Sequence, residues 1–143
     1  MVVQRVMADG RERGPFLTVM AVLFSVLALS NFTKALQNLR DPHLGLVIFG
    51  VRCETLGTNL VLGFLLGAVL AAYAWGLWRM KAWVAPLSVV YAFFVPTNLV
   101  LFWYRDTGPT LPSVASIVSY LVVAFTGSIG TALYLAYHRD RLA

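Results

Sequence analysis

Residues 54–81 read ETLGTNLVLGFLLGAVLAAYAWGLWRMK and contain 24 consecutive uncharged residues between Glu54 and Arg79. The hydrocarbon core of a bilayer is about 30 Å thick, and a helix needs roughly 20 apolar residues to cross it. This stretch therefore predicts a transmembrane helix over Leu56–Trp78, and it decides the class of fold.

Three further uncharged windows predict three more spanning helices. Arg13 and Lys34 enclose 20 uncharged residues, Lys81 and Arg105 enclose 23, and the last window runs from Asp106 to Arg139. The windows do not alternate with a period of two, which argues against a closed β-barrel. We expect a single all-α membrane domain over residues 1–143, a four-helix bundle with helices at about 16–39, 56–78, 83–104 and 113–137.

The connections between these windows predict how the helices are arranged. Short links join the second helix to the third and the third to the fourth, so neighbouring helices should be antiparallel and the bundle up-down-up-down. The first link is longer and contains residues 42–51, PHLGLVIFGV, which are apolar but too few to cross. Such runs are typical of interfacial or re-entrant segments.

The composition excludes several classes of protein. Hydrophobic residues make up 59% of the 143 residues and charged residues 12%, which is about half the usual share in a soluble domain. A short chain cannot bury that much apolar surface in water. With one Cys and two His, we expect no metal site and no cofactor.

The basic residues predict the threading. Lys and Arg near helix ends favour the cytoplasm. Seven of them fall on the side of the termini and four on the other side, so both termini should be cytoplasmic, in a bacterial inner membrane. The net charge of +5 then reflects topology, and we expect no nucleic-acid partner. The seven are Arg5, Arg11, Arg13, Arg79, Lys81, Arg139 and Arg141, and the four are Lys34, Arg40, Arg52 and Arg105.

Residues 11–30 also resemble a signal peptide with an A-x-A-like end, but we interpret them as an uncleaved first helix.

Small residues recur at four-residue spacing on two predicted helices. Close packing of small residues drives helix association in lipid, where hydrophobicity does not. Each ridge could pack inside the bundle or against a partner membrane protein or a second copy of the chain. The ridges are Gly63, Gly67 and Ala71 on the second helix, and Ala124, Ser128 and Ala132 on the fourth.

Polar residues gather in the outer half of the predicted bundle. Polar groups in a membrane are costly and need partners. Asn31, Lys34, Asn59 and Asn98 could border one ligand-binding cavity beside Pro96, which should kink the third helix. Alternatively, each Asn bonds across helices for about 0.6 kcal/mol. Arg52 and Glu54 lie beside this level and complete the candidate site.

Catalytic motifs are missing from the sequence. It holds no G-x-S-x-G, no H-E-x-x-H and no C-x-x-C. We therefore expect a non-enzymatic subunit or scaffold of a membrane assembly, in contact with the lipid bilayer. The alternative is a binding or transport protein for a lipid or small molecule. An enzyme acting on lipid through Glu54, His43 or Cys53 is the weakest hypothesis.

Overall fold

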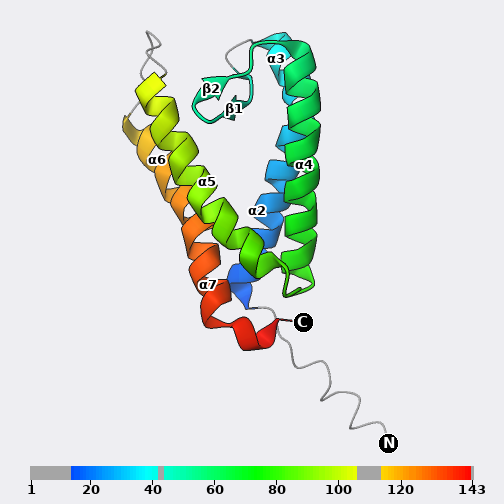
Figure 1. The fold of residues 1–143 in the computed structure, drawn as a ribbon, viewed down its shortest axis with the longest axis vertical. Helices are drawn as coiled ribbons and strands as arrows, with labels where there is room; N and C mark the ends of the chain where they lie inside the picture. The colour runs from blue at the N-terminus through cyan, green and yellow to red at the C-terminus, as the bar shows by residue number, and fades with distance from the viewer. Residues whose placement is uncertain (1–13, 42–43, 106–113, 143) are drawn as a thin grey trace, which may run out of the picture.

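The computed structural model describes residues 14–41, 44–105 and 114–142, with side chains from residue 118 onward in the last segment. Within these residues, four segments are long and apolar enough to cross a membrane, so the chain is a multi-pass, mainly helical membrane protein. The helices are α2 (Pro15–Phe32), α3 (Lys34–Arg40), α4 (Leu56–Trp78), α5 (Val84–Arg105), α6 (Val114–Phe125) and α7 (Thr131–Tyr137), with a short π-helical turn over Thr126–Gly130 and a 3-10 turn over Arg139–Arg141 (Figure 1).

The two middle helices fall close to their predicted bounds. Helix α4 has the predicted limits, and α5 is displaced by one residue at each end. Pro86 lies in the first turn of α5, where its missing N–H is harmless. Pro96 lies inside the continuous span of α5, and the kink expected there stays a prediction.

The first predicted helix is wrong as a single element, because it breaks at Thr33 into α2 and α3. The Thr33 hydroxyl donates to Leu29 O at 3.2 Å and to Ser30 O at 3.1 Å. Gln37 Nε2 also donates to Ser30 O, at 3.1 Å. Ser30 O thus accepts two side-chain bonds, and Leu29 O accepts the Thr33 hydroxyl beside Thr33 N. Side-chain bonds of this kind compete with the helical bonds of the backbone.

The fourth predicted helix also differs from expectation, because a π-helical turn separates α6 from α7. Two glycines, Gly127 and Gly130, lie in this turn and weaken the helical preference of the chain. The Ser128 hydroxyl donates to Ala124 O at 2.6 Å, and a back-bond of this kind bends helices.

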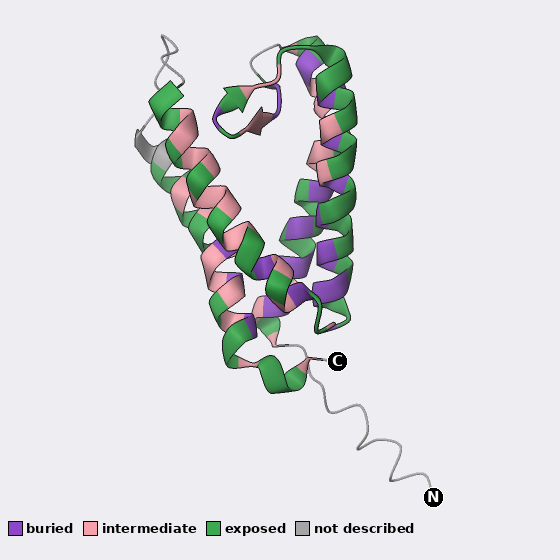
Figure 2. Ribbon diagram, viewed as in Figure 1, coloured by how far each residue is buried: buried purple, intermediate pink, exposed green. Residues whose placement is uncertain are grey.

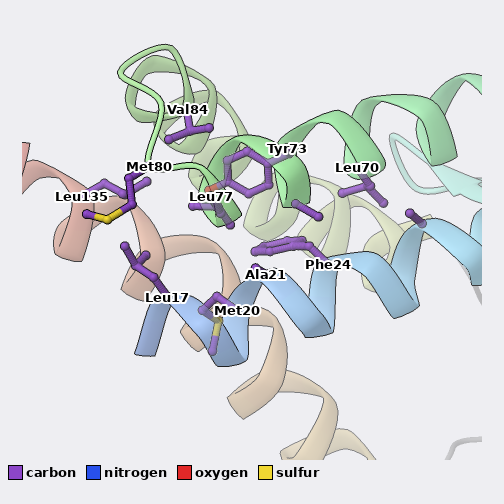
Figure 3. Close-up of a cluster of buried hydrophobic side chains, with 12 residues drawn as sticks. Leu17, Met20, Ala21, Phe24, Leu70, Tyr73, Leu77, Met80, Val84 and Leu135 are labelled. Atoms are coloured by element: carbon purple, nitrogen blue, oxygen red, sulfur yellow. The ribbon is translucent and has the colours of Figure 1, made fainter. Parts of the chain in front are cut away.

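The core lies between α2 and α4 and extends toward the link from α4 to α5. Helix α2 packs along α4, and Figure 2 shows buried residues following their contact. Figure 3 shows the Phe24 and Tyr73 side chains close together, and their rings meet edge to face with centroids 4.8 Å apart. The buried apolar cluster consists of Leu17, Met20, Ala21, Phe24, Ala28, Leu70, Tyr73, Ala74, Leu77, Met80, Val84 and Leu135.

A tight turn after α4 fixes the start of α5. Lys81 N donates to Gly76 O at 2.9 Å, and Met80 has a φ of 51°. This is the Schellman arrangement, with Met80 in the left-handed position that glycine usually takes. A Cβ atom at Gly76 would collide with Val84 and Trp83, so glycine allows the two helices to meet here.

Candidate functional site

The apolar segment before α4 forms a short β-hairpin, which the all-α prediction missed. Strand β1 (Val47–Ile48) pairs antiparallel with β2 (Val51–Arg52), and Val47 lies opposite Arg52. Phe49 and Gly50 have φ values of 48° and 75°, so both central residues of the turn are left-handed, as in type I′ hairpins. The sequence signal for this turn was weak, because Phe rarely occupies the first central position of a type I′ turn, which Asn or Asp usually takes.

Asn59 of α4 holds the base of the hairpin. Its Oδ1 accepts from Leu46 N at 2.7 Å. Its Nδ2 donates to Cys53 O at 2.6 Å and to Thr55 O at 2.9 Å. Asn59 is 0% exposed, so these bonds satisfy polar atoms that water does not reach.

Asn98 and Arg105 of α5 hold the other side of the hairpin. Asn98 Oδ1 accepts from Gly50 N at 3.2 Å, and Asn98 Nδ2 donates to Val47 O at 3.1 Å. Arg105 donates to Phe49 O at 3.0 Å. A Cβ atom at Gly50 would collide with the backbone of Leu101, so the turn lies directly on α5. The hairpin therefore bridges α4 and α5 (Figure 1).

The other predicted site residues lie around this hairpin. Asn31 Nδ2 donates within its own helix, to Leu27 O at 2.8 Å. Lys34 Nζ donates to Gln37 Oε1 at 3.1 Å and to Leu44 O at 3.4 Å. Burial, and to a smaller degree the charge of Arg52, lowers the pKa of Lys34.

The two charged residues of the predicted site, Arg52 and Glu54, do not line the cavity with its amides. The Arg52 guanidinium lies 5.4 Å from the centroid of the Phe102 ring, a cation–π contact with α5. Glu54 is exposed just before α4. Neither side chain joins Asn31 or Asn98 in lining the cavity described next.

A cavity of about 230 Å³ lies beneath the hairpin, between the α2–α4 pair and the α5–α6 pair. Asn31 and Asn98 line it, whereas Lys34 and Asn59 do not. Most of the lining is apolar, unlike the polar cavity that the sequence suggested. The residues from the hairpin are Leu46 and Val47, and those from the helices include Met20, Leu23, Phe24, Leu27, Leu66, Leu70, Tyr91, Phe94, Val95, Tyr120, Val123, Ala124 and Gly127.

Several cavity residues were missed by sequence reasoning, although their spacing carried a signal. Phe24, Leu27 and Asn31 follow i, i+3, i+7 spacing, and Tyr91, Phe94 and Asn98 repeat it on α5. In an apolar membrane helix every face is hydrophobic, so such a stripe does not stand out from its surroundings.

The predicted small-residue ridges are only partly inside the bundle. Gly63 lies against the Asn31 backbone and Gly67 against the Phe32 ring, both from the α2–α3 side. Ala71 is exposed. On the fourth helix Ser128 is buried and Ala132 is half-buried, while Ala124 lines the cavity.

The residues weighed for catalysis do not form a cluster in the described part of the chain. Cys53 is half-buried, and burial raises the pKa of its thiol, which disfavours the reactive thiolate. Within residues 14–41, 44–105 and 114–142, no three His, Cys, Asp or Glu side chains gather where a metal ion could bind. His43, Arg5, Arg11 and Arg13 lie outside the described residues.

Comparisons with protein-family models, with curated proteins and with solved structures find no match to this chain.

Proposed function

We propose that the protein binds a small apolar molecule in the cavity beneath the hairpin, without catalysing a reaction. The observation that supports this proposal is the cavity of about 230 Å³ with its largely apolar, aromatic lining. An apolar protein cavity of about 150 Å³ is known to stay dry and to bind benzene. A cavity half as large again offers room for a bicyclic ring or a short stretch of acyl chain.

The position of the cavity favours a ligand that arrives from the lipid. Its lining includes Leu23 and Leu27 of α2 and Tyr120 and Val123 of α6, and all four side chains are exposed. We infer that the cavity opens beside these exposed residues, on the apolar flank of the helices. A molecule dissolved among acyl chains could enter there without crossing a polar surface.

Binding can be tested with a fluorinated probe, 1-fluoronaphthalene, added to the purified protein in detergent. We expect a protein-dependent shift or broadening of its ¹⁹F resonance. The matched variant is Gly127→Leu, because Gly127 lines the cavity and nothing lies within 4 Å of a Cβ atom built there. An equal ¹⁹F response from the wild-type protein and from Gly127→Leu would refute the proposal.

We also propose the up-down-up-down threading, with both termini in the cytoplasm of a bacterial cell and the hairpin re-entering the outer face of the inner membrane. The seven-to-four bias of Lys and Arg supports this orientation. Phe16 and Tyr134 pack with ring centroids 4.9 Å apart, so the start of α2 and the end of α7 lie at the same end of the molecule. Asn59 and Asn98 satisfy the hairpin backbone, as a non-helical segment requires at membrane depth.

The orientation can be checked by cysteine labelling in intact cells. Arg5→Cys and Arg141→Cys, each combined with Cys53→Ala, should resist an impermeant thiol reagent until the cells are opened. Labelling of either position from outside would reverse the proposed threading.

A second candidate function, a non-enzymatic scaffold subunit, is favoured by a different surface. A groove of about 430 Å³ runs along the lipid-facing side of α2 and α4. Small side chains line its floor, and small residues allow close approach of another membrane helix. The lining residues are Ser25, Ala28, Leu29, Phe32, Ala71, Ala74, Trp75 and Trp78.

The scaffold hypothesis predicts a helix from a second copy or from a partner membrane protein in this groove. Native mass measurement in detergent should then give the mass of an oligomer or a complex. Ala71→Leu would fill the groove and should return the mass to that of one chain, whereas Ala72→Leu, outside the groove, should not. A mass of one chain for the wild-type protein would reject the hypothesis.

A further inference from the structure

The cavity presents polar side chains whose hydrogen-bonding capacity is not used by the protein. Among the described residues, the hydroxyls of Tyr91 and Tyr120 have no hydrogen-bond partner, and Asn31 Oδ1 accepts no bond. All three residues line the cavity.

The second amide of the cavity differs in this respect. Asn98 uses its oxygen on Gly50 N and its nitrogen on Val47 O, so both of its polar atoms are engaged with the hairpin. Asn98 therefore anchors the cover of the cavity, whereas Asn31, Tyr91 and Tyr120 remain available to a ligand. Polar groups without partners in an apolar site cost free energy, and a ligand that pairs with them recovers it.

Aromatic rings lie against one of these polar residues, Tyr91. Tyr91 meets Phe24 edge to face at 5.4 Å between centroids, and its ring is tilted against that of Phe94 at 6.5 Å. Tyr91 and Phe94 come from one face of α5, while Phe24 approaches from α2. Aromatic side chains favour flat rings as partners, in stacked or edge-to-face contact.

We propose that the ligand is a flat, largely apolar ring compound carrying a hydroxyl or carbonyl oxygen, and that Tyr91 and Asn31 recognise this oxygen. The inference depends on the proposed binding function and specifies its ligand class. The Tyr91 hydroxyl can donate to either kind of oxygen, and Asn31 Oδ1 can accept from a hydroxyl. Tyr120, at the exposed margin of the cavity, meets the ligand on entry.

The test compares two probes that differ in one hydroxyl, 1-fluoronaphthalene and 4-fluoro-1-naphthol, titrated by ¹⁹F NMR into protein in the same detergent. Tyr91→Phe keeps the ring contacts and removes the hydroxyl. We expect it to weaken naphthol binding about fivefold, the value of one ordinary hydrogen bond, and to change fluoronaphthalene binding by less than twofold. The matched control is Tyr104→Phe, because Tyr104 lies on α5 outside the cavity and is highly exposed.

Comparing two probes in each variant cancels their partition into detergent. If both probes bind the wild-type protein and Tyr91→Phe affects both equally or neither, the inferred recognition of oxygen is wrong and the apolar cavity remains. If neither probe binds, the proposed function fails and this inference fails with it. Should Tyr91→Phe not fold, Asn31→Leu takes its place, and an unchanged ratio of the two affinities would again overturn the inference.

Discussion

At the scale of single residues, the amides beside the hairpin have a role that the sequence could only partly predict. Because Asn59 and Asn98 lie within predicted membrane spans, the sequence indicated that their side chains would need hydrogen-bond partners. Their partners are backbone groups of the hairpin at residues 46–53. The sequence predicted an apolar segment at residues 42–51 that is too short to cross the membrane, but its pattern did not indicate a hairpin whose backbone these amides would hold.

We predict that Asn59→Leu destabilises the protein more than Asn98→Leu. Asn59 makes three bonds and is fully buried, so its loss leaves the buried N–H of Leu46 and the half-buried carbonyl of Cys53 without this partner. Each such group costs about 1–3 kcal/mol, and we expect a loss of about 3 kcal/mol for Asn59→Leu. Unfolding by dodecyl sulfate in mixed micelles, followed by Trp fluorescence, measures the free energy of unfolding.

Asn98→Leu should cost about 1–2 kcal/mol, because Asn98 is only half-buried and water can reach its former partners. Thr97→Val is the control, since Thr97 is the exposed neighbour of Asn98 on α5. Hydrogen exchange at residues 47–52 should accelerate in both Asn variants. Wild-type stability in Asn59→Leu would show that the hairpin does not depend on this amide.

At the scale of elements, apolar run length predicted the position of α4 and α5 well. Run length did not predict the two places where local polar side chains interrupt the regular α-helix, at Thr33 and at residues 126–130. The hairpin escaped prediction because its turn places Phe49 at a φ of 48°, which a bulky side chain adopts only with tertiary support. That support comes from α5: Phe94 packs against the Phe49 ring with centroids 5.8 Å apart, and Arg105 bonds to its carbonyl.

Gly50→Ala should destabilise the protein by about 2 kcal/mol or more. Its φ of 75° is unfavourable for alanine by about 1–2 kcal/mol, and the new Cβ would strike the Leu101 backbone. The comparison variant is Gly57→Ala in the first turn of α4, where a Cβ meets nothing within 4 Å. Gly57→Ala should raise the free energy of unfolding by about 0.5–1 kcal/mol, as expected in a helix. Equal effects on dodecyl sulfate unfolding would argue against a fixed hairpin turn.

For the contact between the first and second spans, we predict that stability falls in the order Ala68→Leu, Gly67→Leu, Gly63→Leu, with Gly63→Leu the worst. Ala68 is exposed to lipid, so a larger side chain there has room. A side chain at Gly67 would displace the Phe32 ring, which can move, whereas one at Gly63 meets the backbone oxygen of Asn31, which cannot. The yield of folded protein after extraction, with the unfolding free energy, gives the order, and equal values for Gly67→Leu and Ala68→Leu would remove the close packing argument.

At the scale of the whole molecule, the structure consists of two groups of helices that pack together at one end and are bridged by the hairpin at the other (Figure 1). The buried apolar cluster drawn in Figure 3 comes from α2, the second half of α4, the link to α5 and the adjoining ends of α5 and α7, toward the packed end. The cavity lies between this cluster and the hairpin, lined by Phe24 and Leu70 from the cluster and by Leu46 and Val47 from the hairpin. Composition predicted the membrane class and the number of spans, but the cavity depends on how the two groups separate, which no local pattern encodes.

Filling this cavity should stabilise the protein and abolish its response to ligand. Gly127→Leu places an apolar side chain in empty space and replaces a glycine in a helical segment, so we expect the free energy of unfolding to rise by about 1 kcal/mol. Ala72→Leu, an exposed site outside the cavity, should leave the free energy of unfolding unchanged.

A ligand that binds the native state stabilises that state by about 2.7 kcal/mol at a hundred times its Kd. Saturating 1-fluoronaphthalene should therefore raise the stability of the wild-type protein and of Ala72→Leu, but not that of Gly127→Leu, when unfolding is measured with and without the probe. If the probe stabilises all three proteins alike, it acts through the detergent and not through the cavity.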